Sequence, residues 1–235
     1  MRFIPYGHQS IDDEDIQGVV EVLKSDWLTT GPTVDRFERD LASYVGSRHA
    51  VAVNSGTSAL DIAVRALDLP KGSEVITTPF TFAATSNAIL YNDHVPVFAD
   101  IEPVTRNIHP DEIRRQITPK TRAIIYVDYA GHPCAIDEIR EIAREHDLRL
   151  IEDACHAFGA SYKGRKIGTL ADMTIFSFHP VKPITTGEGG AVVTDDPELA
   201  ARLKLLRSHG IDRNVGDLFG EGSQWAYDMV DLGRN

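Results

Sequence analysis

One lysine, Lys182, lies at a position in the sequence that suits an amine nucleophile. Lys182 follows an apolar run at 173–178 that predicts a β-strand, and it precedes a glycine-rich turn at 187–190. A strand end is rigid, and glycines let backbone and ligand approach closely. Burial there disfavours the ammonium form, so the pattern predicts a lysine that forms a Schiff base. The alternative is a loop lysine with a solvated head group.

Two candidate partners of this lysine lie upstream. Asp153 closes a predicted strand at 149–153, and ligands bind at the carboxyl ends of strands in open α/β sheets. A carboxylate there can keep a pyridinium nitrogen protonated, which makes the ring of pyridoxal 5′-phosphate (PLP) an electron sink. His156 could hydrogen-bond the ring oxygen of the same cofactor. The alternatives are a helix N-cap or a structural ion pair for Asp153, and a satisfied core histidine for His156.

Two strand-to-helix turns could complete such a site. The turn at 54–59 puts free N–H groups at a helix N-terminus, where an anion such as phosphate binds. It is not a P-loop, because no Gly-Lys-Ser/Thr follows, and ordinary N-capping by Ser55 or Thr57 is the alternative. The turn at 78–85 carries Phe82, which could stack on a planar ring or lie in the core.

The elements that position these residues alternate between strand and helix. A first helix is predicted after a capping Ser10, and a second at about 34–44. Strands are predicted at 49–54, 74–78, 95–100, 123–128, 149–153, 173–178 and 190–194. The helices between them centre on Ile62, Thr85, Ile113, Ile139 and Leu203. This alternation predicts an α/β fold with a mostly parallel seven-stranded sheet and helices on both faces. The link before 190–194 is too short for a helical crossover, so the last strand is expected to be antiparallel.

Charge and composition narrow the class of protein. The chain has 235 residues and a net charge of −11, which argues against nucleic acid as the main partner. No apolar run reaches the roughly 20 residues of a membrane span. Cys134 and Cys155 have no metal-ligand spacing, so we expect reduced thiols in a cytoplasmic protein and no metal site.

A nucleotide-binding dehydrogenase is the first rival interpretation, because it shares the strand–helix alternation. Its fingerprint needs three glycines after the first strand, whereas the turn at 54–59 offers only Gly56. A non-catalytic binding protein on the same fold is the second rival. The presence of both Lys182 and Asp153 favours chemistry over binding alone.

Together and in this order, the motifs resemble the DegT/DnrJ/EryC1/StrS family of sugar aminotransferases, from Ile4 to Asn235. The resemblance implies that residues 1–235 form the large PLP-binding domain of a fold type I enzyme, with the smaller C-terminal domain absent or truncated. It implies a homodimer that uses L-glutamate as amino donor. Dehydratases of the family carry a histidine in place of Lys182, so a transaminase is expected.

Four segments resemble one group of relatives in particular: 4–7, 127–131, 182–190 and 207–211. These relatives aminate the C4 ketone of a UDP-linked 4-keto-6-deoxy-N-acetylhexosamine, a step toward pseudaminic acid. Another 4-keto nucleotide-sugar, or a truncated non-catalytic protein, stays open as an alternative.

The resemblance also implies roles for single residues. Lys182 would carry the cofactor and move protons, Asp153 would face the pyridine nitrogen, and His156 the ring oxygen. Phe82 would cover the ring face. The phosphate would be held by Gly56, Thr57, Ser58 and Ser177, and across the subunit boundary by Asn235. The sugar-nucleotide site would be lined by Tyr6, Asp26, Trp27, Leu28 and Thr29.

Overall fold

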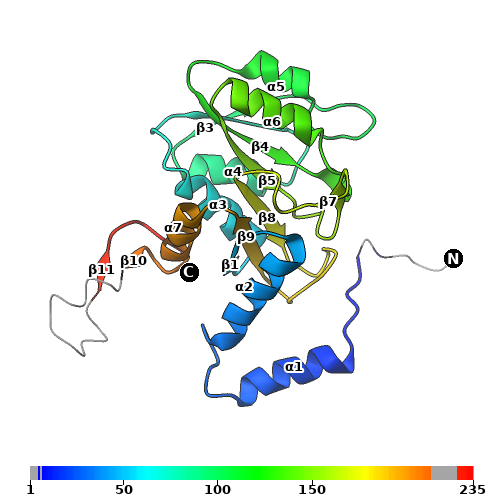
Figure 1. Ribbon diagram of the computed structural model, residues 1–235, viewed down its shortest axis with the longest axis vertical. Coiled ribbons are helices and arrows are strands. Elements are labelled where there is room, and N and C mark those ends of the chain that lie inside the picture. The colour runs from blue at the N-terminus through cyan, green and yellow to red at the C-terminus, as the bar shows by residue number, and fades with distance from the viewer. Residues whose placement is uncertain (1–4, 6, 213–226, 235) are drawn as a thin grey trace.

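A computed structural model describes residues 5, 7–212 and 227–234 (Figure 1). The helices are α1 (Asp13–Lys24), α2 (Pro32–Val45), α3 (Gly56–Ala66), α4 (Ala83–Tyr91), α5 (Pro110–Gln116), α6 (Ile136–Glu145), α7 (Pro197–Arg207) and the 3₁₀ turn η1 (Tyr129–Gly131). The strands are β1 (His49–Val53), β2 (Glu74–Thr77), β3 (Val95–Phe98), β4 (Thr121–Val127), β5 (Arg149–Asp153), β6 (Ser161–Tyr162), β7 (Arg165–Lys166), β8 (Met173–Ser177), β9 (Gly190–Thr194), β10 (Ile211–Asp212) and β11 (Asp228–Met229). No helix in this described part is both long enough and apolar enough to cross a membrane.

Seven strands form the central sheet, in the order β1-β9-β8-β5-β4-β2-β3. Strands β8, β5, β4, β2 and β3 run parallel, whereas β9 is antiparallel to both of its neighbours. The predicted mostly parallel sheet and its antiparallel last strand are therefore confirmed. Because the parallel strands share one direction, their carboxyl ends meet at a single edge, together with the start of β9.

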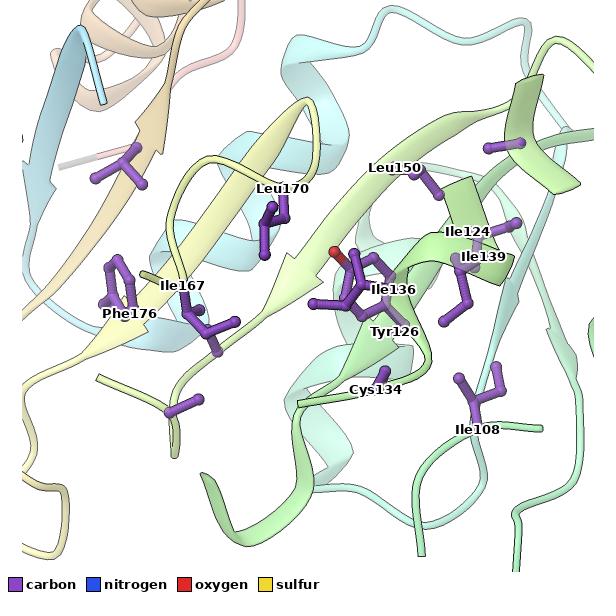
Figure 2. Close-up of a cluster of buried hydrophobic side chains, with 14 of the residues drawn as sticks. Ile108, Ile124, Tyr126, Cys134, Ile136, Ile139, Leu150, Ile167, Leu170 and Phe176 are labelled. Carbon is purple, nitrogen blue, oxygen red and sulfur yellow. The ribbon is translucent and has the colours of Figure 1, made fainter. Parts of the chain in front are cut away.

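Two buried clusters lie on opposite faces of this sheet. Ile124 and Tyr126 of β4 belong to the cluster that includes residues of α2, α5 and α6, part of which Figure 2 shows. Ala123 and Ile125 belong to the cluster that includes residues of α3, α4 and α7. This alternation follows from the two-residue period of strand side chains. Helices thus cover both faces, as predicted, and each fully buried isoleucine contributes about 1.5–3 kcal/mol.

The start of the first helix differs from the prediction. Asp12, not Ser10, is the N-cap of α1, because its carboxylate accepts hydrogen bonds from the N–H groups of Glu14 and Asp15, both at 3.0 Å. Asp15 in return accepts from the Asp12 N–H, which completes a capping box. A cap that serves two otherwise unpaired N–H groups outcompetes a serine two residues earlier.

The outer edge of β1 is held by two charged side chains. The Ala52 N–H donates to Glu38 Oε1 of α2 at 2.8 Å. Arg207, at the end of α7, donates to the same carboxylate oxygen and to the Ala52 carbonyl at 3.1 Å. Glu38 is buried, so this ion pair ties α2, β1 and α7 together where the sheet ends.

Candidate active site

A cavity of about 660 Å³ opens at the carboxyl ends of the parallel strands. Its volume lies in the range of sites for small ligands and cofactors. The structure brings together around it seven of the residues expected from the sequence: Gly56, Thr57, Phe82, Asp153, His156, Ser177 and Lys182. Residues that sequence reasoning did not assign also line it, among them Phe80, Thr85, Tyr129, His179 and Glu188.

Some expected residues lie elsewhere. Ser58 does not line the cavity, since its hydroxyl bonds Asn54 Oδ1 at 2.5 Å. The segment 26–29 is exposed in the connection between α1 and α2 and does not reach the cavity either. Tyr6 and Asn235 lie outside the described residues. Substrate binding by 26–29 and by Tyr6 stays a prediction.

Asp153 lies at the end of β5 with only 5% of its surface exposed. Its Oδ2 accepts a hydrogen bond from Thr85 Oγ1 at 2.8 Å, and its Oδ1 accepts from the Cys155 N–H at 3.3 Å. No helix begins after β5, so the helix N-cap interpretation is wrong. Two donors hold the carboxylate at the cavity wall, and Thr85 is a supporting residue that the sequence did not reveal.

Thr85→Val should weaken PLP binding while leaving the fold intact. Valine keeps the shape of threonine but removes the hydroxyl that fixes Asp153, and a hydrogen bond to a charged group is worth about 1.5–3 kcal/mol. We expect roughly a tenfold or greater loss of affinity, measured by absorbance titration with PLP. Thr85→Ser is the matched control, because it keeps the donor. Equal affinity in both variants would remove Thr85 from this role.

His156 stands half-buried in the cavity wall, next to the turn that follows β4. Its Nδ1 accepts a hydrogen bond from the Ala130 N–H at 3.3 Å. Burial, and secondarily the charge of Lys182, lowers the pKa of His156 below its usual value. The neutral ring therefore carries its hydrogen on Nε2, which leaves Nε2–H as a donor for an oxygen of a bound ligand.

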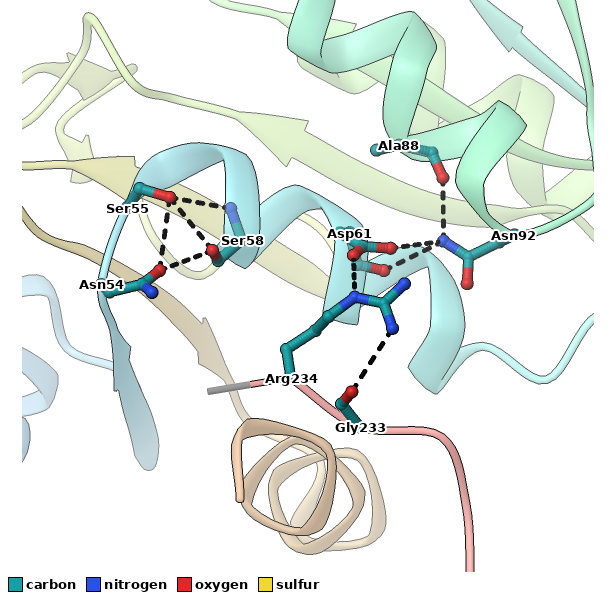
Figure 3. A network of polar contacts seen from close by, with 8 residues as sticks. All are labelled: Asn54, Ser55, Ser58, Asp61, Ala88, Asn92, Gly233 and Arg234. Atoms are coloured by element: carbon teal, nitrogen blue, oxygen red, sulfur yellow. Dashed lines mark hydrogen bonds and ion pairs between the residues drawn. The ribbon is translucent and has the colours of Figure 1, made fainter. Parts of the chain in front are cut away.

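The first turn of α3 forms a cradle for an anion. Ser55 caps the helix by accepting from the Ser58 N–H at 3.1 Å, as Figure 3 shows. The Gly56 and Thr57 N–H groups have no acceptor within the described residues, so both are available to a phosphate. A Cβ on Gly56 would lie 2.9 Å from Ser177 Cβ, so glycine keeps this approach open.

The backbone at Gly190 packs closely against the first turn of α3. A Cβ there would lie 2.4 Å from the carbonyl carbon of Ser55, so Gly190→Ala must displace the start of α3. Overpacking of this kind costs about 1–3 kcal/mol. We expect a lower urea midpoint and weaker phosphate binding. Gly18→Ala, in α1, is the control, since a Cβ there meets nothing within 4 Å. A Gly190→Ala chain as stable as this control would contradict the crowding.

The middle of α3 is joined by an ion pair to the segment 227–234. Arg234 Nε donates to Asp61 Oδ2 at 2.6 Å, and Asn92 Nδ2 donates to Asp61 Oδ1 at 3.0 Å and to the Ala88 carbonyl at 2.8 Å (Figure 3). The contacts join this segment, α3 and α4. They hold in place the helix whose first turn is the anion cradle.

Lys182 lies in the turn after β8. Its N–H donates to the His179 carbonyl at 2.9 Å, and its side chain lines the cavity half-buried. Its charge contributes to the lowered pKa of His156 and opposes the burial that raises the pKa of Cys155, so Lys182 lies close to both. A primary amine, a carboxylate and an anion cradle thus share one cavity.

Known proteins match the chain over nearly its whole length. The Methanocaldococcus jannaschii protein MJ1066 is 49% identical over 98% of this chain and 60% of its own. The UDP-4-amino-4,6-dideoxy-N-acetyl-β-L-altrosamine transaminase of Campylobacter jejuni is 45% identical over 99% of this chain and 60% of its own. The chain thus spans about 60% of the length of these relatives.

A solved structure supports the fold as well. The sugar aminotransferase Spr1654 of Streptococcus pneumoniae, described as putative, matches in its PMP form with a TM-score of 0.92 at 32% identity, over 99% of this chain and 63% of that one. The predicted fold type I architecture is confirmed. The model of the DegT/DnrJ/EryC1/StrS aminotransferase family matches residues 9–232, and this chain belongs to that family.

Proposed function

We propose that residues 1–235 form the large domain of a PLP-dependent aminotransferase that acts on a nucleotide-linked keto-sugar. The observation that carries this proposal is the shared cavity, in which Lys182, Asp153 and the first turn of α3 meet. The amine suits covalent attachment of an aldehyde, the carboxylate suits a pyridinium nitrogen, and the N–H groups of Gly56 and Thr57 suit a phosphate. The residues present therefore fit PLP.

When bound, PLP supplies the electron sink that stabilises negative charge at the carbon next to the transferred nitrogen. The chain supplies the rest. Asp153 would hold the ring-nitrogen proton, and His156 Nε2–H would donate to the ring oxygen. Lys182 Nζ would anchor the cofactor and, when not bound to it, would be placed to take the α-proton of the amino donor. In the second half-reaction the same nitrogen would deliver a proton to the sugar carbon.

For the substrate we propose the C4 ketone of a UDP-linked 4-keto-6-deoxy-N-acetylhexosamine, with L-glutamate as donor. The name of the 45% identical Campylobacter jejuni relative supports this choice. The test is a coupled assay over a panel of 4-keto nucleotide-sugars, run on the chain alone and on a fusion to the C-terminal remainder of that relative. Preference for another 4-keto nucleotide-sugar would replace the substrate, and turnover of free amino acids alone would overturn the sugar assignment.

We propose a homodimer in the cytoplasm, with the cavity near the subunit boundary. Exposed apolar side chains around the cavity support this: Phe82 is 74% exposed, and Phe80 and Val181 about 40%. A monomeric protein rarely leaves such a group in water. We expect sedimentation to give a dimer and Phe82→Asp to shift it toward monomer. A Val104→Asp variant, which places the charge at another exposed apolar site, is the control. A wild-type monomer with normal PLP affinity would count against a shared site.

A further inference from the structure

A row of buried polar groups crosses the sheet on the face opposite Asp153. Tyr126, Glu152 and Thr174 are cross-strand neighbours in β4, β5 and β8. Asp128 follows directly after β4, and its carboxylate accepts from the N–H of Cys134, which belongs to the same buried cluster as Tyr126. All four of these side chains are fully buried. Figure 2 shows Tyr126 in the buried cluster, with Cys134 nearby.

This row has fewer hydrogen-bond donors than its carboxylate oxygens need. Glu152 Oε2 accepts from Thr174 Oγ1 at 2.7 Å, and Asp128 Oδ1 accepts from the Cys134 N–H at 2.9 Å. The other oxygen of each carboxyl, Glu152 Oε1 and Asp128 Oδ2, is buried with no partner among the described residues. The Tyr126 hydroxyl, buried beside them, has one O–H and cannot serve both. A bound proton is the donor that would satisfy the second oxygen.

We propose that Glu152 and Asp128 share one proton, and that this proton holds the loop 128–134 in position against His156. The bond from the Cys134 N–H to Asp128 closes that loop at its far end. Within the loop, the Ala130 N–H is the donor that orients His156. If both carboxyls were ionised, their repulsion in a dry interior would push Asp128 away and loosen the loop.

The electrostatics of the pair agree with this geometry. Burial, reinforced by the charge of Asp128, raises the pKa of Glu152 to about 8, and burial raises the pKa of Asp128 to about 7. The groups that face the two are Tyr126, Thr174, Cys134 and Asp153, which are neutral or acidic. Unlike Glu152 and Asp128, Asp153 has no carboxylate oxygen without a partner, because both of its oxygens accept a hydrogen bond.

Glu152→Gln is the test variant, since glutamine keeps the shape, can donate to Asp128 and cannot ionise. Infrared spectra of the 235-residue chain at neutral pH should show the C=O stretch of a protonated carboxylic acid, and Glu152→Gln should lose it. Glu38→Gln is the matched control, because it removes another buried carboxyl, whose partner is Arg207, and should keep the band. The same band in wild type and Glu152→Gln overturns the shared proton.

Stability against pH gives a second readout. The pKa of Glu152 is raised in the folded chain, so its proton stabilises the fold fully at low pH and less as pH rises to about 8. Relative to Glu152→Gln, the wild-type urea midpoint should fall between about pH 5 and pH 8 and then level off. Thr174→Val should move this fall to higher pH, since the Thr174 hydroxyl favours ionised Glu152. A difference that stays constant across this range overturns the proposal.

Hydrogen exchange tests the positioning step separately. Above pH 8, the Ala130 amide should exchange faster in the wild type than in Glu152→Gln at the same pH, because only the wild type loses the shared proton. Equal exchange rates overturn the link from the carboxyl pair to His156. These experiments use the chain without PLP or substrate, so their outcome is independent of the proposed reaction.

Discussion

Replacing Lys182 by arginine is expected to abolish covalent attachment of PLP. The guanidinium stays protonated at every working pH and offers no nucleophilic amine, although it keeps the positive charge at the same place. Borohydride reduction of the loaded chain, followed by peptide mass spectrometry, should find the adduct on Lys182 in the wild type and nowhere in Lys182→Arg. Loss of the proton-moving amine should also cost about 10²–10⁴-fold in turnover of an active protein.

Lys204→Arg is the matched control for this experiment. Lys204 is exposed in α7, outside the cavity, so its replacement should leave the adduct unchanged. An adduct on Lys163, Lys166 or Lys204 in the wild type, or the absence of any adduct, would remove Lys182 from the proposed role.

Asp153→Asn should preserve the fold and greatly weaken PLP binding. The amide oxygen can still accept from the Cys155 N–H while the amide nitrogen donates to Thr85 Oγ1, so both contacts of the side chain can be kept and the fold should be retained. A buried cation that loses its partner costs about 3–5 kcal/mol, which corresponds to roughly 150- to 4,000-fold in affinity. Absorbance titration with PLP measures the loss, and turnover should fall at least as far, because the neutral residue no longer holds the ring-nitrogen proton.

The control for this substitution is Asp137→Asn. Asp137 is an exposed residue of α6 whose partner is Lys163, and it does not line the cavity. It should bind PLP like the wild type. If Asp153→Asn does the same, the charge that makes the ring an electron sink must come from another residue.

The local pattern of apolar and polar residues in the sequence was enough to predict most of the fold. Short segments rich in apolar and β-branched residues locate all seven strands of the central sheet, and the predicted helix centres all fall inside α3 to α7. The hairpin of β6 and β7 was not predicted, because strands of two residues carry no periodicity. Its turn is marked only by Lys163 and Gly164, with φ angles of 48° and 81°.

The site was predictable to the extent that its residues follow strands. Asp153 closes β5 and Lys182 lies in the turn after β8, and parallel strands bring their carboxyl ends together. The role of Thr85 could not be predicted from the sequence, because its hydrogen bond to Asp153 joins residues 68 positions apart and depends on how tertiary packing places the first turn of α4 near the end of β5. Tyr129 was missed for a similar reason, since its ring is placed by packing on Phe80 at 4.6 Å between centroids.

The contacts of Glu38 and Arg207 with the edge strand β1 bear on how the protein avoids aggregation. A free outer strand offers unpaired N–H and C=O groups, which act as a template on which a strand of another molecule can add. At Ala52 both groups already bond side chains of α2 and α7, so an incoming strand would have to displace a buried ion pair before it could pair there. The two side chains thus take the hydrogen-bonding positions that an eighth strand would occupy at Ala52, and they expose no further strand edge there.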